Sequence, residues 1–146
     1  MPQRDYILRM IEQAGAVLRR ILDLVLARAA QPGEVDRELR SAMGQVGFDL
    51  DFARLADPES LERMVAPDGA LEPGRGWLVA ECLYVDGLEA ELSERPLDAA
   101  HSYEKALRLY KLLAPDAILP SGFPEAAERI AALEVRLQAL GNGQNA

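Results

Sequence analysis

Apolar residues recur at helical spacing through the first part of the chain. Between Tyr6 and Leu26, nine apolar positions repeat every seven residues: Ile7, Ala14, Ile21, Met10, Val17, Leu24, Ile11, Leu18 and Val25. Leu8 and Leu22, with Gly15 between them, widen this stripe to one side. The apolar face is broader than one neighbouring helix covers. We therefore expect this helix to lie at the centre of the domain or to contact a second subunit.

Turn and capping signals divide the rest of the amino-terminal half. The sequence QPG at 31–33 ends the first helix, and apolar spacing predicts a second helix over 34–45. A short, partly helical connection follows. Asp57 before Pro58 then predicts an N-cap and the first position of another short helix, because Asp accepts from free backbone N–H groups and Pro lacks one.

Three longer helices are expected after the Pro- and Gly-rich stretch at 66–76. They cover about 75–94, 97–113 and 124–140, and the tail at 141–146 should fray. Clean period-two alternation is rare, so we predict an all-α fold of six or seven helices in antiparallel hairpins.

The length favours one domain. At 146 residues the chain has the usual size of a single core, and neither half is long enough to bury a generous core alone. We therefore treat 1–146 as a single helical domain. Its parts are the amino-terminal helices at 1–66, a repeat-like hairpin with a capping helix at 75–140, and the tail.

Aromatic and small residues in the carboxy-terminal half have a distinctive spacing. Trp77 and Tyr84 occupy one expected helix, and Ala99, Tyr103 and Ala106 occupy the next. This pattern resembles the tetratricopeptide repeat, whose paired helices carry such residues at such separations. The resemblance covers 77–115 and implies a helical hairpin of the kind that binds proteins or peptides.

Two features depart from that repeat. Between Tyr84 and Ala99 the chain is longer by about six residues than the repeat allows, and Glu81 stands where the family has a small Gly. No second copy occurs at an offset of about 34 residues, although stacked repeats usually need about three units. We expect a single repeat-like hairpin within a globular helical domain.

A wider resemblance covers most of the chain. The segments RDYILRMIEQ, LADPESLERMV and YEKALRLYKLL resemble a family of small uncharacterised bacterial proteins with a tetratricopeptide-like region. This resemblance implies a helical architecture and a bacterial cytosolic setting, and it carries no site residues.

The net charge and the cysteine content argue against several classes of function. The net charge of −8 argues against a nucleic-acid partner, because such surfaces neutralise phosphates with Lys and Arg. Residues 1–30 hold five arginines against three acidic residues, which leaves an anionic membrane surface or an acidic partner as weaker alternatives. The single cysteine gives no disulfide framework, and no run is long enough to span a membrane, so we expect a cytoplasmic protein.

No catalytic, cofactor or metal site is evident. His101 is the only histidine, and Cys82 lies among apolar residues, so we expect a surface residue and a packed core residue. Asp49 and Asp51, and the acidic cluster at 89–98, do not follow the calcium-loop pattern and are expected on solvated surface. We therefore predict a protein that is not an enzyme.

Two functions fit these observations. The first is a non-catalytic protein-interaction module, expected to be a homodimer through its first helix and open to a protein or peptide partner. The candidate interface residues are Ile7, Leu8, Ile11, Gly15, Leu18, Leu22 and Leu26. The candidate groove residues of the repeat-like hairpin are Arg75, Leu78, Cys82, Val85 and Asp86.

The alternative is a small-ligand sensor or carrier. Its pocket would lie between the two halves, with walls from Trp77, Tyr84 and residues near Phe48 and Phe52. The helical spacing of Trp77, Tyr84, Tyr103 and Tyr110 favours a packed core over such a cavity.

Overall fold

The fold of the described residues is entirely helical. The structure is a computed structural model, and it describes residues 2–67, 72–113 and 123–144. Within these ranges there are seven helices and no strand. The helices are α1 (Pro2–Leu26), α2 (Glu34–Gln45), α3 (Leu50–Leu55), α4 (Pro58–Val65), α5 (Pro73–Leu92), α6 (Pro96–Leu112) and α7 (Ala126–Gln144). The all-α class is confirmed.

Local signals in the sequence account for most helix boundaries. The Asp57 carboxylate accepts a hydrogen bond from the Ser60 backbone N–H, with Pro58 at the first helical position, as the sequence predicts. Asp49 caps α3 in the same way by accepting from the Asp51 backbone N–H. The break expected at 114–122, and part of the loop expected at 66–76, lie outside the described residues.

The last helix is longer than expected. We predicted its end near residue 140, followed by a frayed tail at 141–146. Instead α7 continues to Gln144, because neither Gly141 nor Gly143 adopts a positive φ. Residues 141–144 of the expected frayed tail are therefore helical, and residues 145–146 lie outside the described ranges.

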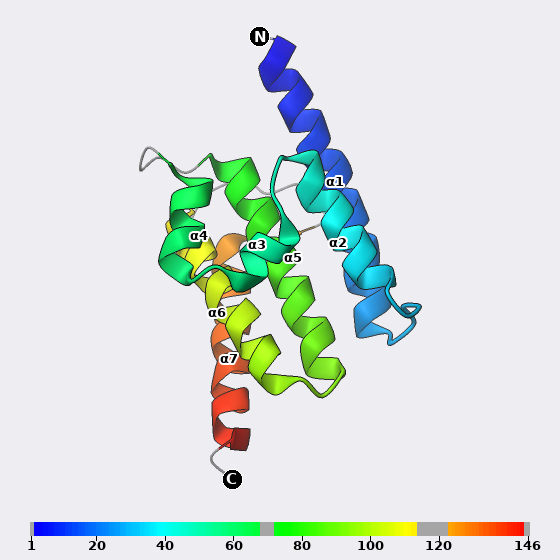
Figure 1. Ribbon diagram of the computed structural model, residues 1–146, viewed down its shortest axis with the longest axis vertical. Coiled ribbons are helices and arrows are strands. Elements are labelled where there is room, and N and C mark those ends of the chain that lie inside the picture. The colour runs from blue at the N-terminus through cyan, green and yellow to red at the C-terminus, as the bar shows by residue number, and fades with distance from the viewer. Residues whose placement is uncertain (1, 68–71, 114–122, 145–146) are drawn as a thin grey trace.

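The centre of the fold is α5. Every residue from Gly76 to Val85 is buried, so this helix has no solvent face over most of its length. It packs against α6, α1 and α2, and Figure 1 shows it between α1 with α2 and α6 with α7. An almost uninterrupted apolar sequence explains this position, because a helix that is apolar all round must be surrounded. The central place expected for the first helix belongs to α5, and α1 covers one side of it.

Close contact between α5 and α6 occurs at a glycine. A Cβ atom on Gly87 would lie 2.5 Å from the Cδ1 and Cε1 atoms of the Tyr103 ring. The absent side chain lets the ring lie directly on the α5 backbone. The sequence suggested no role for Gly87.

Both α1 and α5 end with a non-glycine residue in the left-handed region. Arg28 has φ 55° and Glu94 has φ 62°. In each case a backbone N–H bonds a carbonyl five residues earlier, from Ala29 to Leu24 and from Arg95 to Ala90. This is the Schellman arrangement, in which glycine is preferred. None of the described helices has the length and apolar composition that crossing a bilayer requires.

Candidate functional site

The candidate interface residues of α1 fall into two groups. Ile11, Leu18 and Leu22 are buried in the core of their own chain, and Gly15 is also buried. Ile7 is half-buried, while Leu8 and Leu26 are 49% and 54% exposed. The broad apolar arc is therefore covered mainly by α2 and α5, and only its ends reach solvent.

The outward face of α1 carries charged residues between apolar ends. Tyr6 is 65% exposed near its amino terminus, and Leu26 is exposed at its carboxy terminus. Arg9, Ala16 and Asp23 are exposed between them. Figure 1 shows α1 along one edge of the molecule, with its first turns extending past the other helices. We call Tyr6, Arg9, Ala16, Asp23 and Leu26 the outer α1 face.

The candidate groove residues are covered by the chain itself. Leu78, Cys82 and Val85 have no exposed surface, and Arg75 and Asp86 are only partly exposed. The helices α1 and α2 pack on α5, which leaves no open groove at these three apolar positions. Burial also raises the pKa of the Cys82 thiol well above its ordinary value, because the thiolate would be desolvated.

A buried polar cluster joins α5, α6 and α7. The Arg129 guanidinium donates to both carboxylate oxygens of Glu81, with Nη2–Oε1 at 2.6 Å and Nε–Oε2 at 3.1 Å. The Tyr110 hydroxyl donates to the same carboxylate. Glu81 has no exposed surface, so its charge depends on these partners. Arg129 also lies over the Tyr84 ring, with its Cζ atom 4.4 Å from the ring centroid.

A second cluster repeats this arrangement nearer the surface. The Tyr103 hydroxyl donates to Glu91 at 2.8 Å, and the Arg136 guanidinium lies 3.3 Å from the same carboxylate. The Tyr84 and Tyr103 rings, with centroids 6.3 Å apart, connect the two clusters. Trp77, Tyr84, Tyr103 and Tyr110 are all core residues, as their spacing predicts.

The two clusters favour neutral tyrosines and charged arginines. Burial, and then the Glu81 carboxylate, raises the pKa of Tyr110 well above its ordinary value. Burial and the hydrogen bond to Glu91 raise the pKa of Tyr103 in the same way. Burial alone would lower the pKa of the Arg129 guanidinium, but the attraction of Glu81 outweighs it and the pKa is raised. Neither tyrosine is therefore set up to lose a proton in catalysis.

Sequence reasoning missed these clusters. It identified no partner for Arg129 or Arg136 of the last helix. The Arg129 side chain is only 11% exposed, because it reaches inward to Glu81. A signal was available in Glu81, the one charged residue within the apolar run from Trp77 to Val85. A charge at the centre of such a run requires a partner.

A third polar cluster holds α3 in place. Arg54 forms ion pairs with Asp36 at 2.7 Å and with Asp86 at 2.8 Å, and the Ser102 hydroxyl donates to Asp86 at 3.0 Å. Lys105 is buried, and its Nζ donates to the backbone carbonyls of Ala53 at 2.9 Å and Arg54 at 2.6 Å. These bonds satisfy carbonyls at the end of α3.

Three surface cavities are lined by described residues. One of about 300 Å³ is formed by the end of α1, the α1–α2 connection and the end of α5. A second, of about 610 Å³, lies beside α1 at Gly15 and Phe123. A third, of about 430 Å³, includes His101, which is exposed as expected, and the carboxylates of Asp86 and Glu89. None of the three includes Trp77, Tyr84, Phe48 or Phe52, so none corresponds to the pocket expected between the two halves.

The described residues contain no group of three or more His, Cys, Asp or Glu side chains arranged to hold a metal ion. We found no protein family, curated protein or solved structure that matches this chain significantly.

Proposed function

We propose that this chain is a non-catalytic protein-interaction module that associates with a second copy through the outer α1 face. The observation that carries the proposal is the exposure of Tyr6 and Leu26, 65% and 54%, at opposite ends of one long surface helix. They are separated by twenty residues, a helix length of about 30 Å. A charged face lies between them.

The order of residues on this face is self-complementary. If two α1 helices cross antiparallel about Ala16, Tyr6 of each copy lies at the same height along the helix axis as Leu26 of the other, on the opposite flank of the contact. The same register places Arg9 opposite Asp23, which forms two ion pairs related by the two-fold axis. Ala16 at the crossing point is small, and the cavity beside Gly15 and Phe123 adjoins it, so close approach of the backbones is sterically feasible.

The helices of the carboxy-terminal half form the packed hairpin that supports this module. Glu81 contacts Tyr110 and Glu91 contacts Tyr103, and this reversed order supports an antiparallel hairpin of α5 and α6 with a tetratricopeptide-like character. Because the groove side of α5 is covered, partner binding in this proposal uses outer surfaces. The bacterial, cytoplasmic setting stays a prediction from the sequence.

Sedimentation velocity over a wide range of protein concentrations tests the association. We expect Arg9→Asp and Asp23→Arg each to weaken self-association by about tenfold or more, because each places like charges together twice. The double variant exchanges the two charges and should restore association. Arg37→Asp, an exposed charge reversal on α2, is the matched control and should leave association unchanged.

Two results would overturn the proposal. One is a wild-type chain that stays monomeric at every concentration. The other is a double charge exchange that associates no better than either single variant, since only direct pairing of Arg9 with Asp23 predicts the rescue.

A further inference from the structure

The cavity of about 300 Å³ combines apolar walls with one carboxylate. Its aliphatic lining includes Leu24 and Val25 from the end of α1, Val35 from α2, and Leu92 from the end of α5. Glu89 lies one turn before Leu92 and is the one acidic side chain among the lining residues. Small-molecule sites are usually concave, with aliphatic side chains around a few fixed polar groups. This cavity has about equal shares of the two, and its volume lies at the lower end of the usual range.

Glu89 differs from the neighbouring carboxylates because its side chain has no partner in the part of the chain that the structure describes. No hydrogen bond or ion pair joins its side chain to any of the described residues, although it is partly buried. Asp86, one turn earlier, is bound by Arg54 and Ser102, and Glu91 is bound by Arg136 and Tyr103. Burial, and then the charge of Asp86, raises the pKa of Glu89, and the positive charges of Arg95 and Arg54 offset this only in part.

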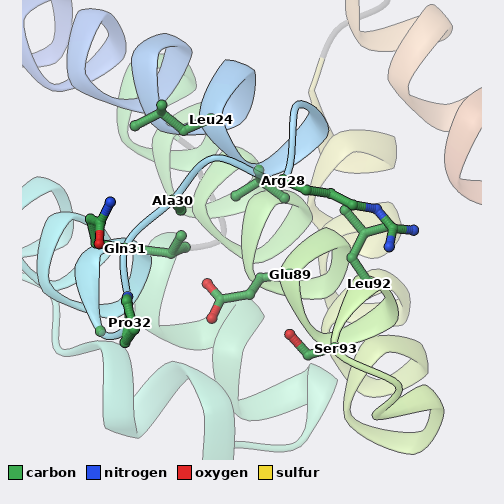
Figure 2. A pocket seen from close by; sticks show the side chains of 11 residues that line it. Leu24, Arg28, Ala30, Gln31, Pro32, Glu89, Leu92 and Ser93 are labelled. Atoms are coloured by element: carbon green, nitrogen blue, oxygen red, sulfur yellow. The ribbon is translucent and has the colours of Figure 1, made fainter.

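The arginine at the cavity does not compensate this charge. Arg28 lines the same cavity, but Figure 2 shows its guanidinium extending past Leu92 while the Glu89 carboxylate points the other way, toward the α1–α2 connection. The Ser93 hydroxyl lies below Glu89 in this view and adds a second polar group. The third cavity, of about 430 Å³, also includes Glu89, so both hollows meet at this carboxylate.

The lining restricts the class of ligand. A single carboxylate is too few ligands for a divalent cation, which needs several oxygen donors. An anion would be repelled by the negative charge of Glu89. A monovalent cation with an aliphatic body matches both parts, because its charge pairs with the carboxylate and its methylene groups displace water from the leucine and valine side chains.

We propose that this cavity binds a small primary alkylammonium ion, with the ammonium group on the Glu89 carboxylate and the alkyl chain between Leu24, Val35 and Leu92. This site is separate from the outer α1 face, and its function does not depend on self-association. The ligand class is set by the lining, so free amines and the amino groups of larger metabolites share the same chemistry.

Titration of the full chain with n-butylammonium, followed by calorimetry and by NMR shifts of Val35 and Leu92, tests the site. The net charge of −8 attracts any cation weakly, so titrations are run at moderate and at high salt. We expect saturable binding that n-butanol does not reproduce. Glu89→Gln should weaken it by about tenfold, the usual effect of losing a charge-assisted hydrogen bond.

Two comparisons separate this site from general attraction. Glu104→Gln, an exposed carboxylate of α6, makes the same charge change and should leave butylammonium binding unchanged. Extending the probe to n-pentylammonium should strengthen binding by about fourfold, the effect of one more buried methylene group. Binding that is equal in both Gln variants, indifferent to chain length, or absent would overturn the proposal.

Discussion

Glu81 and Arg129 form a two-point ion pair in the interior of the fold, although 48 residues separate them in the chain. The carboxylate comes from the central helix α5 and the guanidinium from α7, and α6 adds the Tyr110 hydroxyl between them. A single buried carboxylate therefore connects three helices. It fixes the position of α7, which has few fully buried apolar residues of its own.

Removing one partner of this pair should be costly. We expect Glu81→Gln or Arg129→Gln to lower the free energy of unfolding by about 3–5 kcal/mol, because an uncompensated charge stays buried. The double variant Glu81→Gln with Arg129→Gln should be less destabilised than the sum of the singles. Urea denaturation of the four proteins measures the coupling. Additive effects would contradict a direct interaction.

Gly87 should resist replacement by alanine. The new Cβ would overlap the Tyr103 ring, which is buried and whose hydroxyl is bonded to Glu91. We expect Gly87→Ala to lower the free energy of unfolding by about 1–2 kcal/mol, since overpacking exceeds the gain in helix propensity. Gly44→Ala in α2 is the control, because nothing lies near its Cβ position, and it should be neutral or stabilising. Thermal denaturation compares the two. The idea fails if Gly87→Ala is the more stable variant.

Replacing Glu94 by glycine should stabilise the fold. Its φ of 62° is unfavourable for a side chain with a Cβ atom, and glycine adopts this conformation freely. We expect Glu94→Gly to raise the free energy of unfolding by about 1 kcal/mol, measured by urea denaturation. Glu94→Ala removes the same charge and keeps the Cβ atom, so it should have almost no effect. Equal stability of the two variants would show that the backbone conformation is not the cause.

Ionisation of Glu89 should destabilise the fold. Its pKa is raised above the ordinary value of 4.5 by burial, and then by the charge of Asp86. Above pH 4.5 the folded chain therefore holds this proton longer than the unfolded chain, and the stability falls as pH rises through the folded pKa. The charged groups that act on it, or that line the two cavities it adjoins, are Asp86, Arg95, Arg54, Asp36, Arg28, Asp98 and His101.

Replacing Glu89 by Gln should remove this decline in stability with rising pH. We expect the variant to be more stable than the wild type at neutral pH and to have the flatter profile between about pH 4.5 and 7. Urea denaturation at several pH values gives both curves. Glu104→Gln should reproduce the wild-type profile. A larger stability loss in Glu89→Gln at pH 7 than at pH 4 would reverse the sign and refute the assignment.

Short-range sequence patterns explain why much of the fold can be predicted from the sequence. The caps at Asp57 and Pro58, the turn before Glu34 and the seven-residue repeat in α1 each depend on groups within a few residues of one another. The burial of the four aromatic residues of α5 and α6 also follows from their spacing. Such signals act within one helix, so they predict where it begins, where it ends and which side is apolar.

Which helices pack against one another depends on information that no local sequence pattern contains. The sequence predicted the apolar arc of α1 but not that α5 and α2 cover most of it. It marked Glu81 only as a departure from the repeat and identified no partner for Arg129. It grouped Glu89 with solvated acids, although its neighbours are paired and Glu89 has no partner among the described residues.

The sequence by itself determined the helices, their caps and the all-α class, because these follow from spacing and backbone hydrogen bonding along the chain. Only the tertiary structure decided which charges are paired, which helix is central and which faces stay open. The physical reason is that the rotation and separation of packed helices set which long side chains meet, and residues as distant as Glu81 and Arg129 are brought together only when the whole core assembles.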